Sequence, residues 1–245
     1  MRDRAWYSAP VKPVPLASWS VNRLLGHSVA WLEDPPLLTR RGAFVGDIRF
    51  PHQLHMRVVR SSYANAVLRS VNVGMALPVP GIVAAWTAAD IADLPPIDFR
   101  DPAAEVLRPY QQPLLARERL RYVEEPIAAI FATDPYLAED GAELISVEAE
   151  VLTPILDASA APTSFSPGLS TEALVLRAGY GDVEAGFAAA HAIVALDLAI
   201  GRHSAVPIET RGALARFDAA SDLLELYGAA KVPHRNRDAC SATAQ

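Results

Sequence analysis

The polar residues best placed to do chemistry lie in the segment GRHSAVPIETRG, residues 201–212. It places Arg202, His203, Glu209 and Arg211 between two apolar stretches, where polar side chains cost free energy unless they are paired. Two interpretations remain equally open: an internal ion pair between Glu209 and an arginine, or contacts to a ligand. We expect Glu209 to be structural, and buried or half-buried beside a partner.

Two adjacent carboxylates, Glu124 and Glu125, form a second candidate site. Like charges can separate two carboxyl pKa values and so provide an acid and a base. Neighbouring residues of a strand point to opposite faces, however, so both side chains cannot reach one substrate atom. We therefore predict a structural pair at the edge of a turn.

Histidines and glycines give weaker candidates. His52 and His55 have a spacing that suits a metal site on a helix, but Pro51 and the following alternation favour a strand, on which the two rings diverge. The glycines of GYGDVEAG, residues 179–186, lack the spacing of either nucleotide-binding loop, so no phosphate site is predicted. No Gly-x-Ser-x-Gly, His-Glu-x-x-His or calcium-loop motif occurs.

The first part of the chain is predicted to consist mainly of short strands. Alternating apolar and polar residues indicate strands at residues 43–50, 53–61 and 66–73, which we expect to begin a small antiparallel sheet. Residues 80–94 predict an apolar strand followed by a short helix with Thr87 as its N-cap.

The clearest predicted unit is a strand, a helix and a strand. The segment PIAAIFA, residues 126–132, is typical of a buried strand. Asp134 then caps a helix that has Pro135 at its first position and ends near Leu144. Residues 145–152 alternate as a second strand.

A polar, proline-rich linker is predicted at residues 157–173, between two parts of the chain. After it we expect a helix that begins at Asp182, a strand at 192–200, and a hairpin at 212–229 that turns at DAASD. The final stretch, 231–245, shows no helix-capping pattern.

Composition restricts the class of protein. The 245 residues are 51% apolar, which allows a sizeable core, and the net charge of -6 disfavours nucleic-acid binding. Cys240 is the only cysteine, so no internal disulfide forms and a reducing compartment is expected. No apolar run approaches the ~18 residues of a membrane span, and no leader peptide is recognised. We expect a soluble, cytoplasmic protein.

The chain resembles the N-terminal part of the large, molybdenum-binding subunit of the xanthine dehydrogenase, aldehyde oxidase and carbon monoxide dehydrogenase family. The resemblance covers about Leu25 to Asp238, and the bacterial carbon monoxide dehydrogenase-like branch resembles the chain most. It rests on colinear blocks: GHSVAWLEDPPLLTRRGAFVGDI, LHMRVVRSSYANAVLRSVNV, PGIVAAWTAADI, RYVEEPIAAIFATDPYLAEDGAELISVEAE, GDVEAGFAAAHAIVALDLAIGRHSAVPIETRGALARFD and KVPHRNRD.

The resemblance implies an α+β fold with an α/β hammerhead domain at residues 39–158. An N-terminal arm would occupy 1–38 and a linker 159–180, and residues 181–245 would form the incomplete beginning of a molybdopterin-binding domain. In the family, a glycine-rich cofactor loop and a catalytic glutamate come later, beyond Gln245. The resemblance therefore implies a truncated domain.

Several positions depart from the family pattern. Near residues 201–210 many members supply a glutamine that faces the molybdenum, and this chain has none; His203 is the nearest polar substitute and the candidate cofactor-binding residue. No catalytic residue or metal ligand is assigned. The family usually has glycine where Glu124 stands. Other departures are Trp31, Ser62, Ala230 and Lys231.

The function implied by the resemblance is that of the N-terminal portion of a molybdenum hydroxylase large subunit. The complete assembly would hydroxylate carbon or oxidise carbon monoxide, with molybdopterin carrying molybdenum as the cytosine dinucleotide. Its partners would be the remaining molybdopterin-binding chain, an iron–sulfur subunit and a flavin subunit. The isolated chain is expected to bind no cofactor and to be inactive. Alternatives are a noncatalytic assembly module or a truncated remnant.

Overall fold

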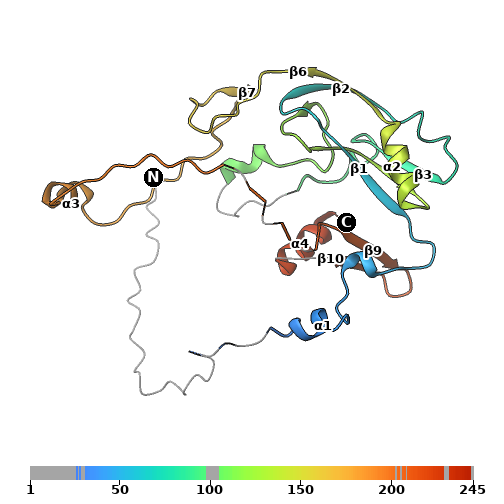
Figure 1. The fold of residues 1–245 in the computed structure, drawn as a ribbon. Helices are drawn as coiled ribbons and strands as arrows, with labels where there is room; N and C mark the ends of the chain where they lie inside the picture. Colours follow the sequence, from blue (N-terminus) through green and yellow to red (C-terminus); the bar gives the residue numbers. More distant parts are fainter. Residues whose placement is uncertain are drawn as a thin grey trace. The chain divides into compact units, whose positions relative to one another are not determined.

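The computed structural model describes residues 26, 28, 31–97, 105–201, 203–204, 206–207, 209–228 and 232–243. The predicted α+β class is confirmed. The chain divides into two compact units, residues 49–211 with 229–245 and residues 1–48 with 212–228 (Figure 1). Of the N-terminal arm implied at residues 1–38, only residues 26, 28 and 31–38 are described.

The first sheet of the larger unit is antiparallel and has the strand order β1-β5-β3. Its strands are β1 (His55–Arg60), β5 (Pro126–Ala132) and β3 (Ile82–Trp86). The central strand β5 is almost entirely buried, as its uninterrupted apolar sequence predicted. Successive side chains of a strand point to opposite faces, and both faces of β5 are covered: Ala128 and Ile130 belong to one core cluster and Ile127 to the other.

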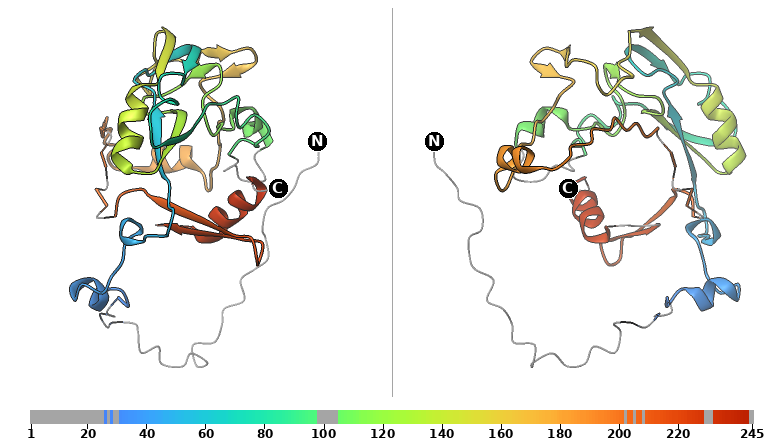
Figure 2. Two further views of the ribbon diagram at one scale, coloured as in Figure 1. Left: turned by 90° about the vertical axis from the view of Figure 1, so that its right-hand side faces the viewer. Right: turned by 60° about the vertical axis from the view of Figure 1, so that its left-hand side comes forward.

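Helix α2 (Pro135–Glu143) packs against all three strands of this sheet and lies beside β1 in the views of Figures 1 and 2. The predicted cap is confirmed: the Asp134 carboxylate accepts hydrogen bonds from the backbone N–H groups of Tyr136 and Leu137. Ala138 and Gly141 are the buried residues of the helix. The first core cluster therefore lies between α2 and the sheet and centres on Ile130.

The second sheet has the order β4-β2-β6, with strands β4 (Arg119–Leu120), β2 (Ala66–Asn72) and β6 (Ser146–Val151). Its pairings are antiparallel. The second core cluster forms around the fully buried Ala66 and Leu120. The predicted strands 53–61 and 66–73 both exist, but the expectation that they begin one sheet is wrong. Each pairs with a strand distant in sequence, which local alternation cannot specify.

Two predictions of local structure are wrong, and in both places an aspartate side chain bonds to the neighbouring backbone. Residues 43–50 contain the 3-10 helix η2 (Val45–Asp47) in place of a strand, since the Asp47 carboxylate accepts a hydrogen bond from Phe44 N–H at 2.9 Å and turns the chain. Residues 87–93 form turns, and no helix. There the Asp90 carboxylate accepts from both the backbone N–H and the hydroxyl of Thr87.

Four further elements complete the larger unit: the 3-10 helix η3, the small hairpin β7–β8 and two helices. The predicted linker contains β7 (Ser164–Ser166) and β8 (Leu169–Ser170). Helix α3 (Val183–Ala189) begins after Asp182, as predicted. Helix α4 occupies the stretch for which no capping pattern was found. The remaining bounds are η3 (Glu105–Tyr110) and α4 (Pro233–Thr243).

The smaller unit contains helix α1 (Asp34–Leu38), η2 and an antiparallel hairpin of β9 (Ala213–Asp218) and β10 (Leu223–Gly228). The hairpin and its turn are as predicted. None of the helices within the described residues combines the length and apolar character needed to cross a membrane.

Candidate functional site

His203, the predicted cofactor-binding residue, is exposed on an irregular segment. Its ring Nδ1 lies 3.4 Å from the carbonyl oxygen of Gly201, within the same segment. Glu209 is half-buried and Arg211 is exposed, whereas Arg202 lies outside the described residues. His203, Glu209 and Arg211 line neither of the two pockets described below. The cofactor role of His203 therefore stays a prediction.

The strand predicted at residues 192–200 is absent. Its side chains are highly exposed, with Leu198 at 85% and Ile200 at 87%. A strand needs a neighbour for its N–H and C=O groups, and no strand in the described part of the chain pairs with this segment. Exposed apolar patches are typical of surfaces that bind a partner, a ligand or a membrane.

One face of the β9–β10 hairpin is also apolar and exposed. Phe217 pairs with Leu224 and Ala215 with Leu226, and directly paired residues share a face of the hairpin. Phe217 is 61% exposed and Leu226 is 51% exposed. The opposite face carries the ion pair between Arg216 and Glu225. We call Ala215, Phe217, Leu224 and Leu226 the apolar hairpin face.

The two adjacent glutamates occupy different surroundings. Glu125 is 1% exposed, and its carboxylate accepts hydrogen bonds from the backbone N–H of Arg121 and, at 2.9 Å, from the Nε–H of the same residue. Glu124 has its side chain exposed and its backbone in the left-handed region, with φ 73°. The pair lies at the edge of a turn, as predicted, and Glu125 forms an ion pair with Arg121. The burial of Glu125 was missed, although Arg121 four residues earlier was a signal for it.

The two candidate histidines lie in different local structures. His52 lies in a turn with φ 58°, while His55 begins β1. Among the residues that the structure describes, no group of three or more His, Cys, Asp or Glu side chains could hold a metal ion.

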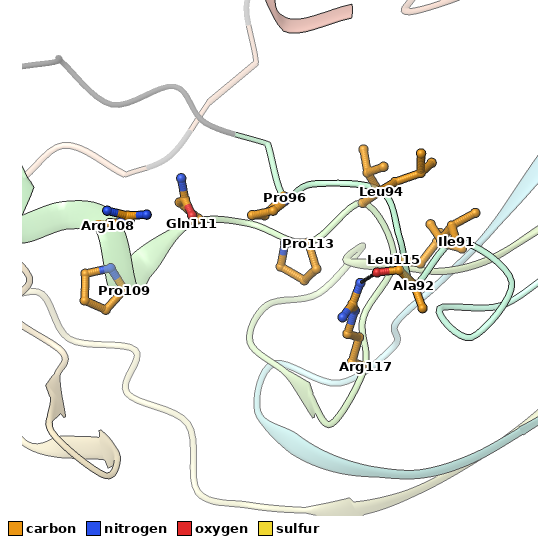
Figure 3. Close-up of a pocket in the computed structure, with 11 residues that line it drawn as sticks. Ile91, Ala92, Leu94, Pro96, Arg108, Pro109, Gln111, Pro113, Leu115 and Arg117 are labelled. Carbon is orange, nitrogen blue, oxygen red and sulfur yellow. Dashed lines mark hydrogen bonds between the residues drawn. The ribbon is translucent and has the colours of Figure 1, made fainter. Parts of the chain in front are cut away.

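A pocket lies in the larger unit, between the turn that follows β3 and the segment that contains η3 (Figure 3). Its volume is about 390 Å³. Arg108 and Gln111 lie toward one end, Arg117 and Ala92 toward the other, and prolines lie between them (Figure 3). The lining residues are Ile91, Ala92, Leu94, Pro96, Arg108, Pro109, Gln111, Pro113, Leu114, Leu115 and Arg117. No motif indicated this pocket, because its residues come from two segments, 91–96 and 108–117, that no local sequence pattern connects.

A second pocket of about 340 Å³ adjoins the first through Pro109. Tyr110 lines it and fixes the small hairpin: its hydroxyl donates to the Ser170 carbonyl oxygen and accepts from Ser170 N–H, both at 3.0 Å. Tyr122 and Gln112 face the same space and are hydrogen-bonded to each other. The two hydrogen bonds between Tyr110 and Ser170 therefore connect η3 to β8 at the wall of this pocket.

Neither of these two pockets includes a described residue of the segment around His203. Residues 172–201 are almost entirely exposed, and both pockets are lined chiefly by residues before 123. No catalytic step is therefore assigned to a residue of this chain.

Two family models match the chain. The α/β hammerhead domain of aldehyde oxidase and xanthine dehydrogenase matches residues 39–153, and the molybdopterin cofactor-binding domain matches residues 167–245. Together these matches include most of the elements of both compact units.

The chain is similar to large subunits of bacterial enzymes. The 6-hydroxypseudooxynicotine dehydrogenase complex subunit gamma of Paenarthrobacter nicotinovorans is 36% identical over 87% of this chain, and the nicotine 6-hydroxylase large subunit of that organism is 32% identical over 96%. In both cases the match spans 28% of the relative's own length. The carbon monoxide dehydrogenase large chain of Hydrogenophaga pseudoflava is less similar, at 28% identity.

Similarity in structure supports the same assignment. The crystal structure of quinoline 2-oxidoreductase from Pseudomonas putida 86 matches 82% of this chain and 26% of its own chain, with a TM-score of 0.62 and 31% identity. With both domain models, these similarities show that the chain belongs to the xanthine dehydrogenase, aldehyde oxidase and carbon monoxide dehydrogenase family, whose hammerhead and molybdopterin-binding domains it matches in turn.

Proposed function

We propose that this chain supplies the hammerhead domain and the first part of the molybdopterin-binding domain of a molybdenum hydroxylase that acts on a nitrogen heterocycle. The similarity to a nicotine 6-hydroxylase large subunit over 96% of the chain carries this proposal. The likeness to quinoline 2-oxidoreductase supports the same substrate class. In such an enzyme a ring carbon is hydroxylated with oxygen from water.

The proposed assembly contains further components. The molybdopterin cofactor, as the cytosine dinucleotide, would supply the oxygen-transfer chemistry, and electrons would pass to an iron–sulfur subunit and a flavin subunit. The name of the gamma-subunit relative places that protein in a complex. Because Cys240 is the only cysteine, a reducing cytoplasm suits the chain.

The domain boundaries are also a proposal. We assign an arm to residues 1–38, the hammerhead domain to 39–158, a linker to 159–180 and the molybdopterin-binding region to 181–245. Within that region His203 is the candidate residue for facing the cofactor. A catalytic base would come from polypeptide equivalent to the remainder of the relatives' large subunits.

This division of roles gives the chain a structural task. A two-stranded hairpin is marginally stable unless its apolar side is covered. The apolar hairpin face and residues 192–200 would both be covered by the polypeptide that completes the molybdopterin-binding domain. A noncatalytic assembly module is the alternative, and the same exposed apolar surface favours it.

The decisive experiment measures cofactor and turnover with and without the completing polypeptide. We would produce the chain alone and together with a polypeptide equivalent to the later part of the nicotine 6-hydroxylase large subunit. Molybdenum content and oxidation of nicotine, quinoline and carbon monoxide would then be measured with an artificial electron acceptor. We expect the chain alone to bind no molybdenum and to show no turnover.

The outcomes separate the two functions. Molybdenum and heterocycle oxidation that appear only in the combined sample would support the hydroxylase. Association of the two polypeptides without either would favour the assembly module. Stoichiometric molybdenum and turnover in the chain alone would refute the proposed division of roles.

A further inference from the structure

The pocket of about 390 Å³ has the features of a small-molecule site independent of the proposed oxidation chemistry. Its size lies within the usual range for ligand pockets, and its wall is mostly apolar. Pro96, Pro109 and Pro113 restrict the backbone of that wall, since each ring fixes one dihedral angle. A wall with few conformations loses little entropy when a ligand binds.

The charges in the pocket are of one sign. Arg108 and Arg117 line it, and no Asp or Glu side chain does so among the described residues. Arg117 is held in place because its Nη2 donates to the carbonyl oxygen of Ala92 at 3.1 Å. In the described part of the chain, the guanidinium of Arg108 has no hydrogen bond or ion pair.

The two cations lie toward opposite ends of the pocket, with Pro96 and Pro113 between them (Figure 3). A guanidinium carries five N–H donors, so Arg117 keeps donors for a ligand while it holds Ala92. The arrangement fits a molecule that has an anionic group at each end and an apolar middle.

We propose that this pocket binds an elongated organic dianion, such as a linear dicarboxylate, whose ends pair with Arg108 and Arg117. The aliphatic middle of the ligand lies on the proline and leucine wall. The charge-assisted hydrogen bonds at both ends select against monoanions and neutral analogues of equal length.

Titrations of the whole chain with succinate, adipate and suberate test the proposal, followed through the backbone amide signals of Ala92, Leu114 and Leu115 by NMR. Hexanoate, which has one carboxylate on a chain of the same length as adipate, is the control ligand. We expect one dicarboxylate of the series to bind best, and about tenfold more tightly than its monoanion.

The variants Arg108→Gln and Arg117→Gln should each weaken binding of that dicarboxylate by about tenfold. Arg57→Gln is the control with the same charge change, because Arg57 pairs with Glu139 and does not line the pocket. Arg117 also holds Ala92, so the urea midpoint of Arg117→Gln would be measured as a check on folding. Arg108 makes no such contact, so Arg108→Gln decides the outcome if Arg117→Gln unfolds.

Several results would overturn the proposal. Equal binding of hexanoate and the dicarboxylates would exclude recognition of two charges. Unchanged affinity in Arg108→Gln, or an equal loss in Arg57→Gln, would exclude a specific contact. Absence of shifts at the pocket amides with every dicarboxylate would exclude the site.

Discussion

The Glu125 carboxylate lies 2.9 Å from Nε of Arg121, and the two partners differ in burial. The Glu125 side chain is 1% exposed and that of Arg121 is 30% exposed. Arg121→Met would leave a buried carboxylate without its cation, so we expect a loss of about 3 kcal/mol in the free energy of unfolding. Glu125→Gln should cost less, about 1–2 kcal/mol, because the arginine reaches water. Urea denaturation measures both.

The ion pair between Arg57 and Glu139 provides the control for this comparison. Its side chains are 54% and 52% exposed, with 2.8 Å between Nη2 and Oε1. Arg57→Met should therefore change stability by less than about 1 kcal/mol. Equal losses in the Arg57 and Arg121 variants would contradict the role of burial.

Glu124→Gly should stabilise the protein. Glu124 has φ 73°, a region that costs a residue with a Cβ about 1 kcal/mol relative to glycine. Its carboxylate lies 3.9 Å from Arg60 and is exposed, so little is lost with it. We expect a net gain of about 0.5–1 kcal/mol in thermal or urea unfolding.

Gly168→Ala is the converse of that substitution. Gly168 has the same φ of 73°, and a Cβ built there would meet no atom within 4 Å. We expect a loss of about 1 kcal/mol that arises from the backbone alone. A stabilising Gly168→Ala, or a destabilising Glu124→Gly, would show that backbone conformation does not dominate at these turns.

Asp134→Ala should destabilise the larger unit by about 1 kcal/mol, since it removes the acceptor for Tyr136 N–H at the start of α2. Asp182→Ala removes an equivalent cap, with Ala185 N–H as its donor. Helix α3 contains no buried residue, so its fraying should leave global unfolding nearly unchanged. Similar losses in both variants would contradict this difference.

The hydrogen bonds from Thr87 lower the pKa of Asp90 below its usual value of 3.8; the backbone bond has the larger effect and the hydroxyl bond the smaller. A lowered folded pKa means that Asp90 stabilises the fold fully above the unfolded pKa, and that this contribution disappears as pH falls through the folded pKa. Thr87→Val should raise the pKa of Asp90 part of the way toward 3.8, as measured by NMR titration. An unchanged pKa of Asp90 would show that the Thr87 hydroxyl does not contribute to the shift.

Replacing Phe217 and Leu224 by Gln should reduce binding of a hydrophobic dye to the chain, because both side chains belong to the apolar hairpin face and are exposed. Arg216→Gln, on the opposite face of the hairpin, is the control and should leave dye fluorescence unchanged. Equal dye fluorescence in the unaltered chain, the variant with both substitutions and Arg216→Gln would mean that other apolar surface binds the dye.

The sequence was sufficient where local chemistry decides conformation. The Asp134 and Pro135 pair marked the start of α2, and the uninterrupted apolar run marked β5 as buried. The separated family blocks were also informative, since they led to the hammerhead and molybdopterin-binding assignment.

Only the tertiary structure decided which strands pair and which polar groups are buried. β1 and β2 follow each other in the chain, yet they join different sheets because their backbone groups pair with β5 and β6, far away in sequence. Alternation indicates that a strand has two faces; it carries no information about the neighbour. The same limit applies to Glu125 and to the pocket lined by Arg108 and Arg117, since burial and the placement of two cations around one pocket depend on segments brought together by folding.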